Sequence, residues 1–315
     1  KLMMINPGVR ETCVPHTSYD NHHEVDLETV FSNMNITKPA NENNEVSINP
    51  LDVVIAIFLC ADNFLRQKIA EKMSTCQLGV PFTLPGEKQD TMLLWALRGI
   101  VRKWKNHNSD NYIESSVVSV QIPTISFIQM GNFRKNKERL LNRLLSPPDH
   151  QQNFFWHKEM EGGTTMSQLS TDTVEMMWYL PRGDKNDRLP TATTIVNYRG
   201  DEILPEGKVA WLAKVSSMSC IFVEALDGEI REKIKTLKGK NKHILLIILF
   251  EDSRKAEVIS QLKVLVQEAN FQQNEIIVQS QQNTNEAELT RLIQSKLIGK
   301  IQSGELVSKK IVDMT

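Results

Sequence analysis

The chain has 315 residues, of which 40% are hydrophobic and 24% are charged, and its formal net charge at pH 7 is -1. This composition is typical of a globular protein rather than a disordered one. The near balance of 37 basic and 38 acidic residues excludes an overall positive field, so we expect no nucleic-acid partner. No apolar run of roughly 18 residues occurs, so no membrane span is predicted. The 4 cysteines form no CxxC pair, which argues against a zinc knuckle or a disulfide framework.

The first third of the chain divides into two segments of different composition. Residues 1–49 are polar and rich in Pro and Asn, which predicts a flexible lead-in or linker. Residues 50–111 predict a helical segment. Apolar residues recur every three or four positions over 51–69, which predicts one amphipathic helix, or two helices joined near Asp62. A similar apolar stripe predicts a further helix over 90–104.

Residues 112–302 show a different pattern, in which apolar strands alternate with helices, and residues 303–315 form a short tail. The predicted strands are 117–120, 124–129, 174–179, 193–196, 219–223, 244–250 and 276–279. The predicted helices are 137–145, 228–237, 253–269 and 284–301. This alternation predicts an α/β fold with a mostly parallel sheet and helices on both of its faces.

The most informative segment follows the strand predicted at 124–129. The strand runs into Gly131, and Lys137 opens the next helix six residues later. This is the position and length of the phosphate-binding loop G-x-x-x-x-G-K-[S/T]. In such a loop, backbone amides, here those of Gly131 and Asn132, hold phosphates at a helix N-terminus, and the lysine neutralises them.

The match to this loop is partial. The second glycine is replaced by Asn136, which tolerates a left-handed backbone better than most residues. The hydroxyl residue that would hold magnesium is replaced by Glu138, whose negative charge would lie close to the phosphates. Taken alone, the motif fits an ordinary turn between a strand and a helix about as well as it fits a nucleotide site.

Five separated blocks of sequence extend the argument. In order along the chain, they occupy residues 49–85, 93–104, 122–132, 140–161 and 196–201. Together they resemble the very large interferon-inducible GTPases and their relative, the up-regulator of cell proliferation, over roughly residues 48 to 300. The resemblance implies a P-loop G domain of the dynamin-related kind, GTP and Mg²⁺ as ligands, and a cytoplasmic and nuclear location. It also implies that the chain is part of a longer protein.

Two further G-domain motifs follow the phosphate-binding loop. A switch threonine that closes on magnesium is expected between the first helix and the next strand, where Thr164 and Thr165 stand; an ordinary loop is the alternative. The D-x-x-G motif is represented by Asn197 to Gly200, so that the glycine is kept while the aspartate is an asparagine. A neutral amide is a much weaker ligand for a divalent cation than a carboxylate. Asp201, one residue past the glycine, is not expected to take over this function.

The base-reading motif N/T-K-x-D is also altered. After the strand predicted at 244–250 the chain continues with Glu251 and Asp252, and no Asn-Lys pair precedes the aspartate. Asp252 is therefore a candidate for the base-binding carboxylate at an unusual spacing. Hydrogen bonds to charged groups contribute about 1.5–3 kcal/mol each, so three altered positions could remove roughly 5 kcal/mol of nucleotide binding. A micromolar site would then move towards millimolar affinity.

The residues thus support two functions. The first is a guanine-nucleotide-binding G domain with weak or no hydrolysis, in which Lys137 grips phosphate and Gly200 senses the γ-phosphate. The second is a pseudo-GTPase scaffold that binds protein partners or further copies of itself. The two are separated by whether Glu138, Asn197 and the 251–252 pair meet in one pocket.

Overall fold

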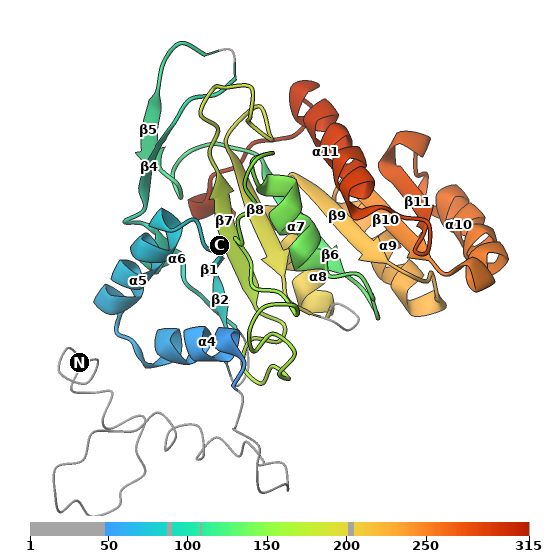
Figure 1. Cartoon of the computed structure of the whole chain (residues 1–315), viewed down its shortest axis with the longest axis horizontal. Coiled ribbons are helices and arrows are strands. Elements are labelled where there is room, and N and C mark those ends of the chain that lie inside the picture. Colours follow the sequence, from blue (N-terminus) through green and yellow to red (C-terminus); the bar gives the residue numbers. More distant parts are fainter. Residues whose placement is uncertain (1–47, 87–89, 108, 201–204, 315) are drawn as a thin grey trace, which may run out of the picture.

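A computed structural model describes residues 48–86, 90–107, 109–200 and 205–314 (Figure 1). The predicted lead-in over 1–49 therefore lies almost entirely outside the described residues. At its end, Asn49 caps the first helix: its side-chain oxygen accepts a hydrogen bond from the backbone N–H of Leu51 at 3.0 Å, and Pro50 occupies the first helical position.

A seven-stranded sheet forms the centre of the molecule (Figure 1). Its strand order is β1-β7-β8-β6-β9-β10-β11. Pairs β8·β6, β6·β9, β9·β10 and β10·β11 are parallel, whereas β7 is antiparallel to both of its neighbours. The strands are β1 (Val80–Pro81), β6 (Thr124–Gln129), β7 (Val174–Tyr179), β8 (Thr193–Tyr198), β9 (Met218–Val223), β10 (Ile244–Phe250) and β11 (Ile276–Ser280). The mostly parallel α/β architecture predicted from the sequence is confirmed.

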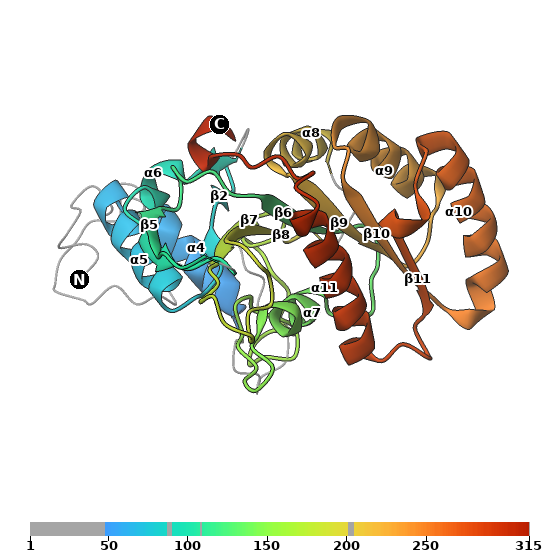
Figure 2. The same cartoon turned by 90° about the horizontal axis from the view of Figure 1, so that it is seen from above.

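Helices cover both faces of this sheet (Figure 2). Helices α7 (Lys137–Leu145) and α11 (Glu286–Gln302) pack on one face, and α8 (Glu206–Val215), α9 (Gly228–Lys240) and α10 (Lys255–Ala269) pack on the other. All seven residues of β10 are buried. Ile244 and Leu246 belong to the core under α8–α10, whereas Leu245 and Ile247 belong to the core under α7 and α11. A strand buried on both faces explains why its sequence is continuously apolar.

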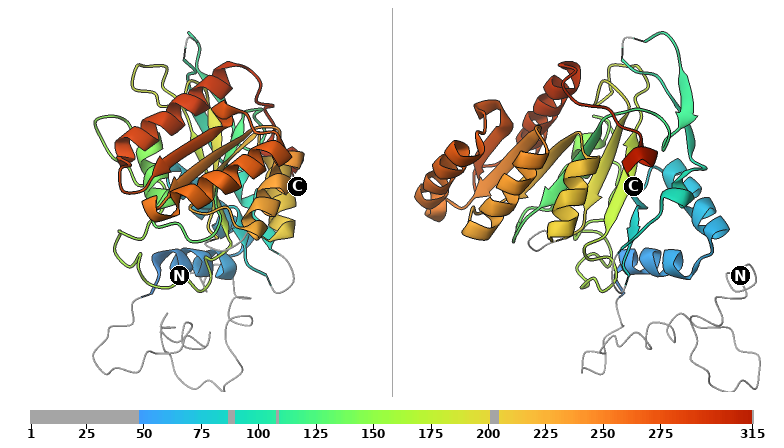
Figure 3. Two further views of the ribbon diagram at one scale, coloured as in Figure 1. Left: turned by 90° about the vertical axis from the view of Figure 1, so that its right-hand side faces the viewer. Right: turned by 180° about the vertical axis from the view of Figure 1, so that it is seen from behind.

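The segment before the sheet packs against the β1–β7 end (Figures 1 and 3). It contains α4 (Pro50–Cys60), α5 (Asn63–Thr75), the short helix α6 (Leu94–Leu97) and two small antiparallel pairs. These pairs are β2 (Thr83–Leu84) with β3 (Thr91–Met92), and β4 (Val101–Trp104) with β5 (Ile113–Ser116). Phe82 stacks on Trp211 of α8 with ring centroids 5.6 Å apart. The segment and the sheet therefore share one core.

Of the two arrangements predicted over 51–69, the second is confirmed: two helices cover 50–75, and Asp62 caps the second by accepting from the Leu65 N–H at 2.8 Å. Other predicted elements differ from the observed ones. The predicted helix over 90–104 is wrong: only the short helix α6 is helical there, and β3 and β4 pair with β2 and β5. The predicted strand at 117–120 is a turn. Helix α8 was not predicted.

The topology singles out one end of the sheet. The chain leaves β6 to form β7 and β8 on one side, and then crosses to β9 on the other side. In open α/β sheets, ligands bind at such a switch point, beyond the carboxyl ends of the strands. The loop between β6 and α7, which carries the phosphate-binding motif, lies at this position. Among the described residues, no helix is long and apolar enough to cross a membrane.

Candidate functional site

The loop after β6 begins with the predicted glycine. Gly131 has a φ of +71°, a conformation that favours glycine, and a Cβ there would lie 3.0 Å from Ile230 Cδ1 of α9. Asn132 is exposed. The next residue, Phe133, is 4% exposed and packs edge-on against Phe222, with ring centroids 5.6 Å apart. The loop is therefore anchored in the core by an aromatic side chain.

Asn136 does not take the left-handed backbone expected of a glycine substitute. Its φ of -82° and ψ of 108° are extended, and its side chain accepts a hydrogen bond from the Arg139 N–H at 3.1 Å. Asn136 is thus the N-cap of α7, and Lys137 is the first residue of the helix. The sequence correctly predicted that this helix begins at Lys137, but it did not identify Asn136 as its N-cap.

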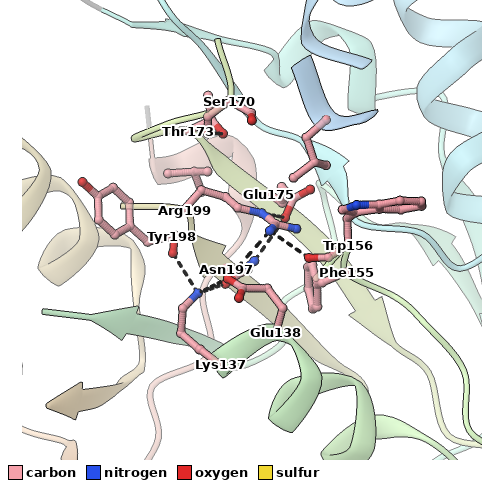
Figure 4. Close-up of polar contacts among 12 residues, drawn as sticks. Lys137, Glu138, Phe155, Trp156, Ser170, Thr173, Glu175, Asn197, Tyr198 and Arg199 are labelled. Atoms are coloured by element: carbon pink, nitrogen blue, oxygen red, sulfur yellow. Dashed lines mark hydrogen bonds and ion pairs between the residues drawn. The ribbon is translucent and has the colours of Figure 1, made fainter. Parts of the chain in front are cut away.

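The ammonium group of Lys137 points into the protein (Figure 4). The side chain is 2% exposed, and its Nζ donates to Glu138 Oε1 at 2.7 Å, to Asn197 Oδ1 and to the backbone oxygen of Tyr198 at 2.9 Å. A lysine ammonium has three protons to donate, so these three contacts use all of them. In this conformation the lysine that the motif assigns to phosphate is held by the protein itself.

A second cation completes the network (Figure 4). Arg199, just after β8, donates from Nε to Glu175 Oε2 at 2.6 Å and from Nη1 to the Trp156 backbone oxygen at 2.8 Å. Its Nη1 also lies 3.8 Å from Glu138 Oε1. The Asn197 amide donates to the same oxygen of Glu175 at 3.1 Å. Two cations and two carboxylates thereby form a closed, largely buried group.

This network fixes the charge of its members. Burial alone would raise the pKa of Glu138, but the Lys137 ammonium and the Arg199 guanidinium outweigh burial and lower the pKa to about 2. Burial lowers the pKa of Lys137, and the charge of Glu138 opposes that change. Glu138 is therefore an ionised carboxylate between two cations, and the negative charge that would repel a phosphate is also the charge that holds Lys137.

Other loop groups are also bonded within the protein. The backbone N–H of Arg134 donates to a carboxylate oxygen of Glu224, which follows β9, and the Arg134 side chain pairs with Glu251, which follows β10. Lys135 Nζ contacts the Thr284 backbone oxygen at 3.4 Å. One backbone N–H of the loop, that of Arg134, therefore already donates to a carboxylate of the chain.

The predicted switch threonines lie next to this network. Thr164 and Thr165 line a pocket of about 460 Å³, together with Glu138, His157 and Arg199. Burial lowers the pKa of His157. The structure therefore brings the predicted switch threonines and Glu138, the last residue of the phosphate-binding motif, to one pocket.

The start of α4 holds this switch loop. Asn49 Nδ2 donates to the Thr165 backbone oxygen at 2.8 Å. Asp52, which is 3% exposed, accepts from the backbone N–H groups of Gln168 at 2.6 Å, Leu169 at 3.0 Å and Ser170 at 2.8 Å. Consecutive backbone N–H groups of this kind form an anion-binding nest, and a carboxylate of the chain fills it.

The remaining predicted residues are placed as follows. Gly200 is buried, and a Cβ there would lie 2.3 Å from Tyr198 Cε1, so only glycine fits. Asp201 lies outside the described residues. Asp252 is exposed in the 3₁₀ turn Asp252–Arg254, and it is the preceding Glu251 that contacts the loop through Arg134. Glu138 and Asn197 both accept hydrogen bonds from Lys137. The 251–252 pair does not join them, because Glu251 contacts the loop only through Arg134.

Two members of the network were not predicted from the sequence. Glu175 is a carboxylate inside an otherwise apolar strand, and Arg199 stands inside the altered D-x-x-G motif. A buried charge in a strand is uncommon unless it is paired. Glu175 in a predicted buried strand could therefore have indicated that a cation lies opposite it.

The residues at this site do not fit Mg²⁺. Glu138 stands where the motif has its magnesium-binding hydroxyl, and its charge is already neutralised by Lys137 and Arg199. Asn197 stands where the motif has its magnesium-binding aspartate, and its Oδ1 accepts a hydrogen bond from Lys137. Across the described part of the chain, no group of three or more His, Cys, Asp or Glu residues is arranged to hold a metal ion. The Arg199 guanidinium supplies positive charge beside Glu138 instead.

The architecture is consistent with a G-domain-like α/β fold, with a lysine-bearing loop at its switch point. A family model described as "Up-regulator of cell proliferation-like domain" matches residues 48–315, so the chain belongs to this family. It is 33% identical over 210 residues to the up-regulator of cell proliferation of Mus musculus, covering 65% of this chain and 23% of that protein. The resemblance inferred from the sequence is thereby confirmed.

Two human proteins are also similar. The chain is 33% identical over 199 residues to interferon-induced very large GTPase 1, covering 61% of this chain and 8% of that protein. It is 28% identical over 235 residues to caspase recruitment domain-containing protein 6, covering 72% of this chain and 22% of that protein. The chain thus spans less than a quarter of the length of each of these relatives.

Proposed function

We propose that this chain is a pseudo-GTPase: a P-loop G domain that neither hydrolyses GTP nor depends on it, and that acts through contacts with protein partners or further copies of itself. The observation that carries the proposal is the engagement of all three Lys137 donors by Glu138, Asn197 and Tyr198. Interferon-induced very large GTPase 1 is called a GTPase, which supports descent of this domain from a nucleotide-binding ancestor.

The cost of admitting a nucleotide supports the same proposal. Phosphate could reach Lys137 only if Glu138 moved away, and that would leave a buried carboxylate with Arg199 as its remaining cation. Breaking one side of a buried ion pair costs about 3–5 kcal/mol. A nucleotide would have to supply this free energy in addition to binding without a magnesium hydroxyl or a magnesium carboxylate.

A second candidate is weak binding of guanine nucleotide without hydrolysis. It is favoured by the pocket of about 460 Å³, in which Thr164, Thr165 and Glu138 lie together as the motifs require. Here Gly131 and Asn132 would contribute amides, and GTP would displace Glu138 from Lys137.

A titration with a fluorescent GTP analogue, with and without Mg²⁺, separates the two candidates. For the native chain we expect no saturable binding below about 100 µM, a ligand concentration that corresponds to about -5.5 kcal/mol. Glu138→Ser combined with Asn197→Asp restores the hydroxyl and the carboxylate of the motif, and we expect this variant to bind more tightly than the native chain, and only with Mg²⁺.

Lys137→Ala in the native background is the matched control. Saturable binding by the native chain that Lys137→Ala abolishes, with both proteins folded by circular dichroism, would contradict the pseudo-GTPase proposal and favour the second candidate. Equal, weak binding by both proteins would show that the residual affinity for nucleotide does not depend on Lys137.

A further inference from the structure

A separate pocket lies at the open edge of the sheet, away from the loop after β6. It has a volume of about 390 Å³ and lies between the end of α5, the β4–β5 hairpin and the outer edge of β7. Strand β1 pairs with only two residues of β7, Glu175 and Met176. Within the described residues, no strand pairs with 177–179 on that side.

The backbone of Trp178 faces this gap. Phe82 N donates to Val174 O at 2.7 Å, which shows that the Val174 carbonyl points to the outer side of β7. Because carbonyl directions alternate along a strand, Met176 and Trp178 point to the same side. The register of β1 would place Leu78 opposite Trp178, but the Leu78 N–H donates to Met73 O at 2.9 Å instead. Trp178 therefore presents an unpaired strand edge.

The walls of the pocket are basic and aromatic. Arg102, Lys103 and Arg182 line it, and none of its lining residues is acidic. Trp104, Trp178 and Tyr112 supply its aromatic side chains. An open strand edge is satisfied by an added extended segment, whose backbone supplies the missing hydrogen-bond partners.

We propose that residues 24–31 of this chain add to the outer edge of β7 as an extended strand. These residues read Glu-Val-Asp-Leu-Glu-Thr-Val-Phe. The acidic residues stand at positions 24, 26 and 28, and Val25, Leu27, Thr29 and Phe31 stand between or after them. With the period of two of a strand, one face carries three carboxylates and the other is apolar or β-branched.

The charges and the chain length support this occupant. Three carboxylates on one face complement the three cations that line the pocket. Residue 31 precedes Ile48, the first described residue, by 48 − 31 = 17 residues. An extended stretch of that length reaches roughly 55 Å, which is enough to cross a domain of this size.

Hydrogen–deuterium exchange of the full chain, followed by NMR, tests the proposal at the backbone amide of Trp178, because Met177 and Tyr179 face β8 and Pro181 has no amide hydrogen. We expect the Trp178 amide to be protected in the native chain. In Glu24→Lys/Asp26→Lys/Glu28→Lys its exchange becomes roughly tenfold faster, which corresponds to about 1.4 kcal/mol. The matched control is Glu11→Lys/Glu42→Lys/Glu45→Lys, which makes the same change of charge elsewhere in the first 47 residues and leaves exchange unchanged.

A variant on the pocket side tests the same contact. Arg182 is exposed, so Arg182→Glu does not disturb the core. As a single substitution, we expect it to speed exchange of the Trp178 amide. When it is combined with Glu24→Lys/Asp26→Lys/Glu28→Lys, we expect exchange to slow again, because the two reversed charges attract each other.

The outcomes that overturn the proposal are distinct. Fast exchange of the Trp178 amide in every variant means that the edge is open, and slow exchange in every variant means that something other than residues 24–31 covers it. Protection that rises with protein concentration assigns the strand to a second copy rather than to the same chain.

Discussion

At the scale of single residues, the pair Lys137 and Glu138 determines what this site can do. A lysine at the start of a helix and at the end of a loop is placed to bind phosphate, but the adjacent Glu138 turns its ammonium inward. The negative charge of Glu138 is also stabilised by Arg199, which forms a second ion pair with Glu175. One substitution in the motif, from a hydroxyl to a carboxylate, thus changes both the metal ligand and the availability of the lysine.

The pH dependence of unfolding reports on this pair. The pKa of Glu138 is lowered from its ordinary value to about 2 in the folded chain, so its ionisation stabilises the fold above pH 4.5, and this contribution is lost as pH falls towards 2. We expect Glu138→Gln to cost about 3 kcal/mol at pH 7, measured by urea denaturation, and to cost progressively less below about pH 4.5. A cost that does not change between pH 7 and pH 3.5 would show that Glu138 is not held as an ion in the fold.

At the scale of elements, α4 is tied to the switch loop. Asp52 in the first turn of α4 binds three successive backbone N–H groups of residues 168–170, and Asn49 binds Thr165. In a working switch these residues would move when the nucleotide changes. Here the start of α4 bonds this loop directly, through Asn49 and Asp52.

Removal of the Asp52 carboxylate tests this coupling. Asp52→Ala leaves three N–H groups without their acceptor, and we expect a loss of about 3 kcal/mol in the free energy of unfolding and faster amide exchange across 163–171. Asp62→Ala, which removes the N-cap of α5, is the matched control, with a loss of about 1 kcal/mol. If the two variants leave exchange at 163–171 equally slow, α4 does not hold the loop.

The same scale shows what could be predicted from sequence. Long apolar runs placed six of the seven strands of the sheet, whereas the two-residue strand β1 was not predicted. Helix α7 was predicted at 137–145 because its apolar face is a local signal. The stretch 90–104 has helical spacing but pairs with other strands, so tertiary contacts override its pattern. Helix α8 was missed because its N-cap is Pro205, which makes no side-chain capping bond, and Gly207 weakens its first turn.

The candidate site was only half predictable for a related reason. The loop position, Lys137, Gly131 and the switch threonines are arranged along the sequence, so spacing reveals them. Glu175, Arg199 and Asp52 act across 24 to 118 positions, and only the fold brings them to their partners. Spacing along the sequence carries no signal for contacts of this kind.

At the scale of the whole molecule, a G-domain-like sheet, a helical segment and a self-neutralised site form one structure. The sheet places its loops at the switch point, the ion pairs occupy that point, and α4 closes over the neighbouring loop. This arrangement is what the proposed pseudo-GTPase requires, because the donors of Lys137 are already bonded within the chain.

The most direct test of this account is a double-mutant cycle on Lys137 and Glu138. Unfolding free energies are measured by urea denaturation at pH 7 for the native chain, Lys137→Met, Glu138→Gln and the double variant, with and without GTP and Mg²⁺. We predict a coupling energy of about 2–3 kcal/mol that nucleotide does not change, because the two side chains bond each other in the resting protein. A coupling energy below about 0.5 kcal/mol, or one that vanishes when GTP is added, would mean that Lys137 is available to phosphate.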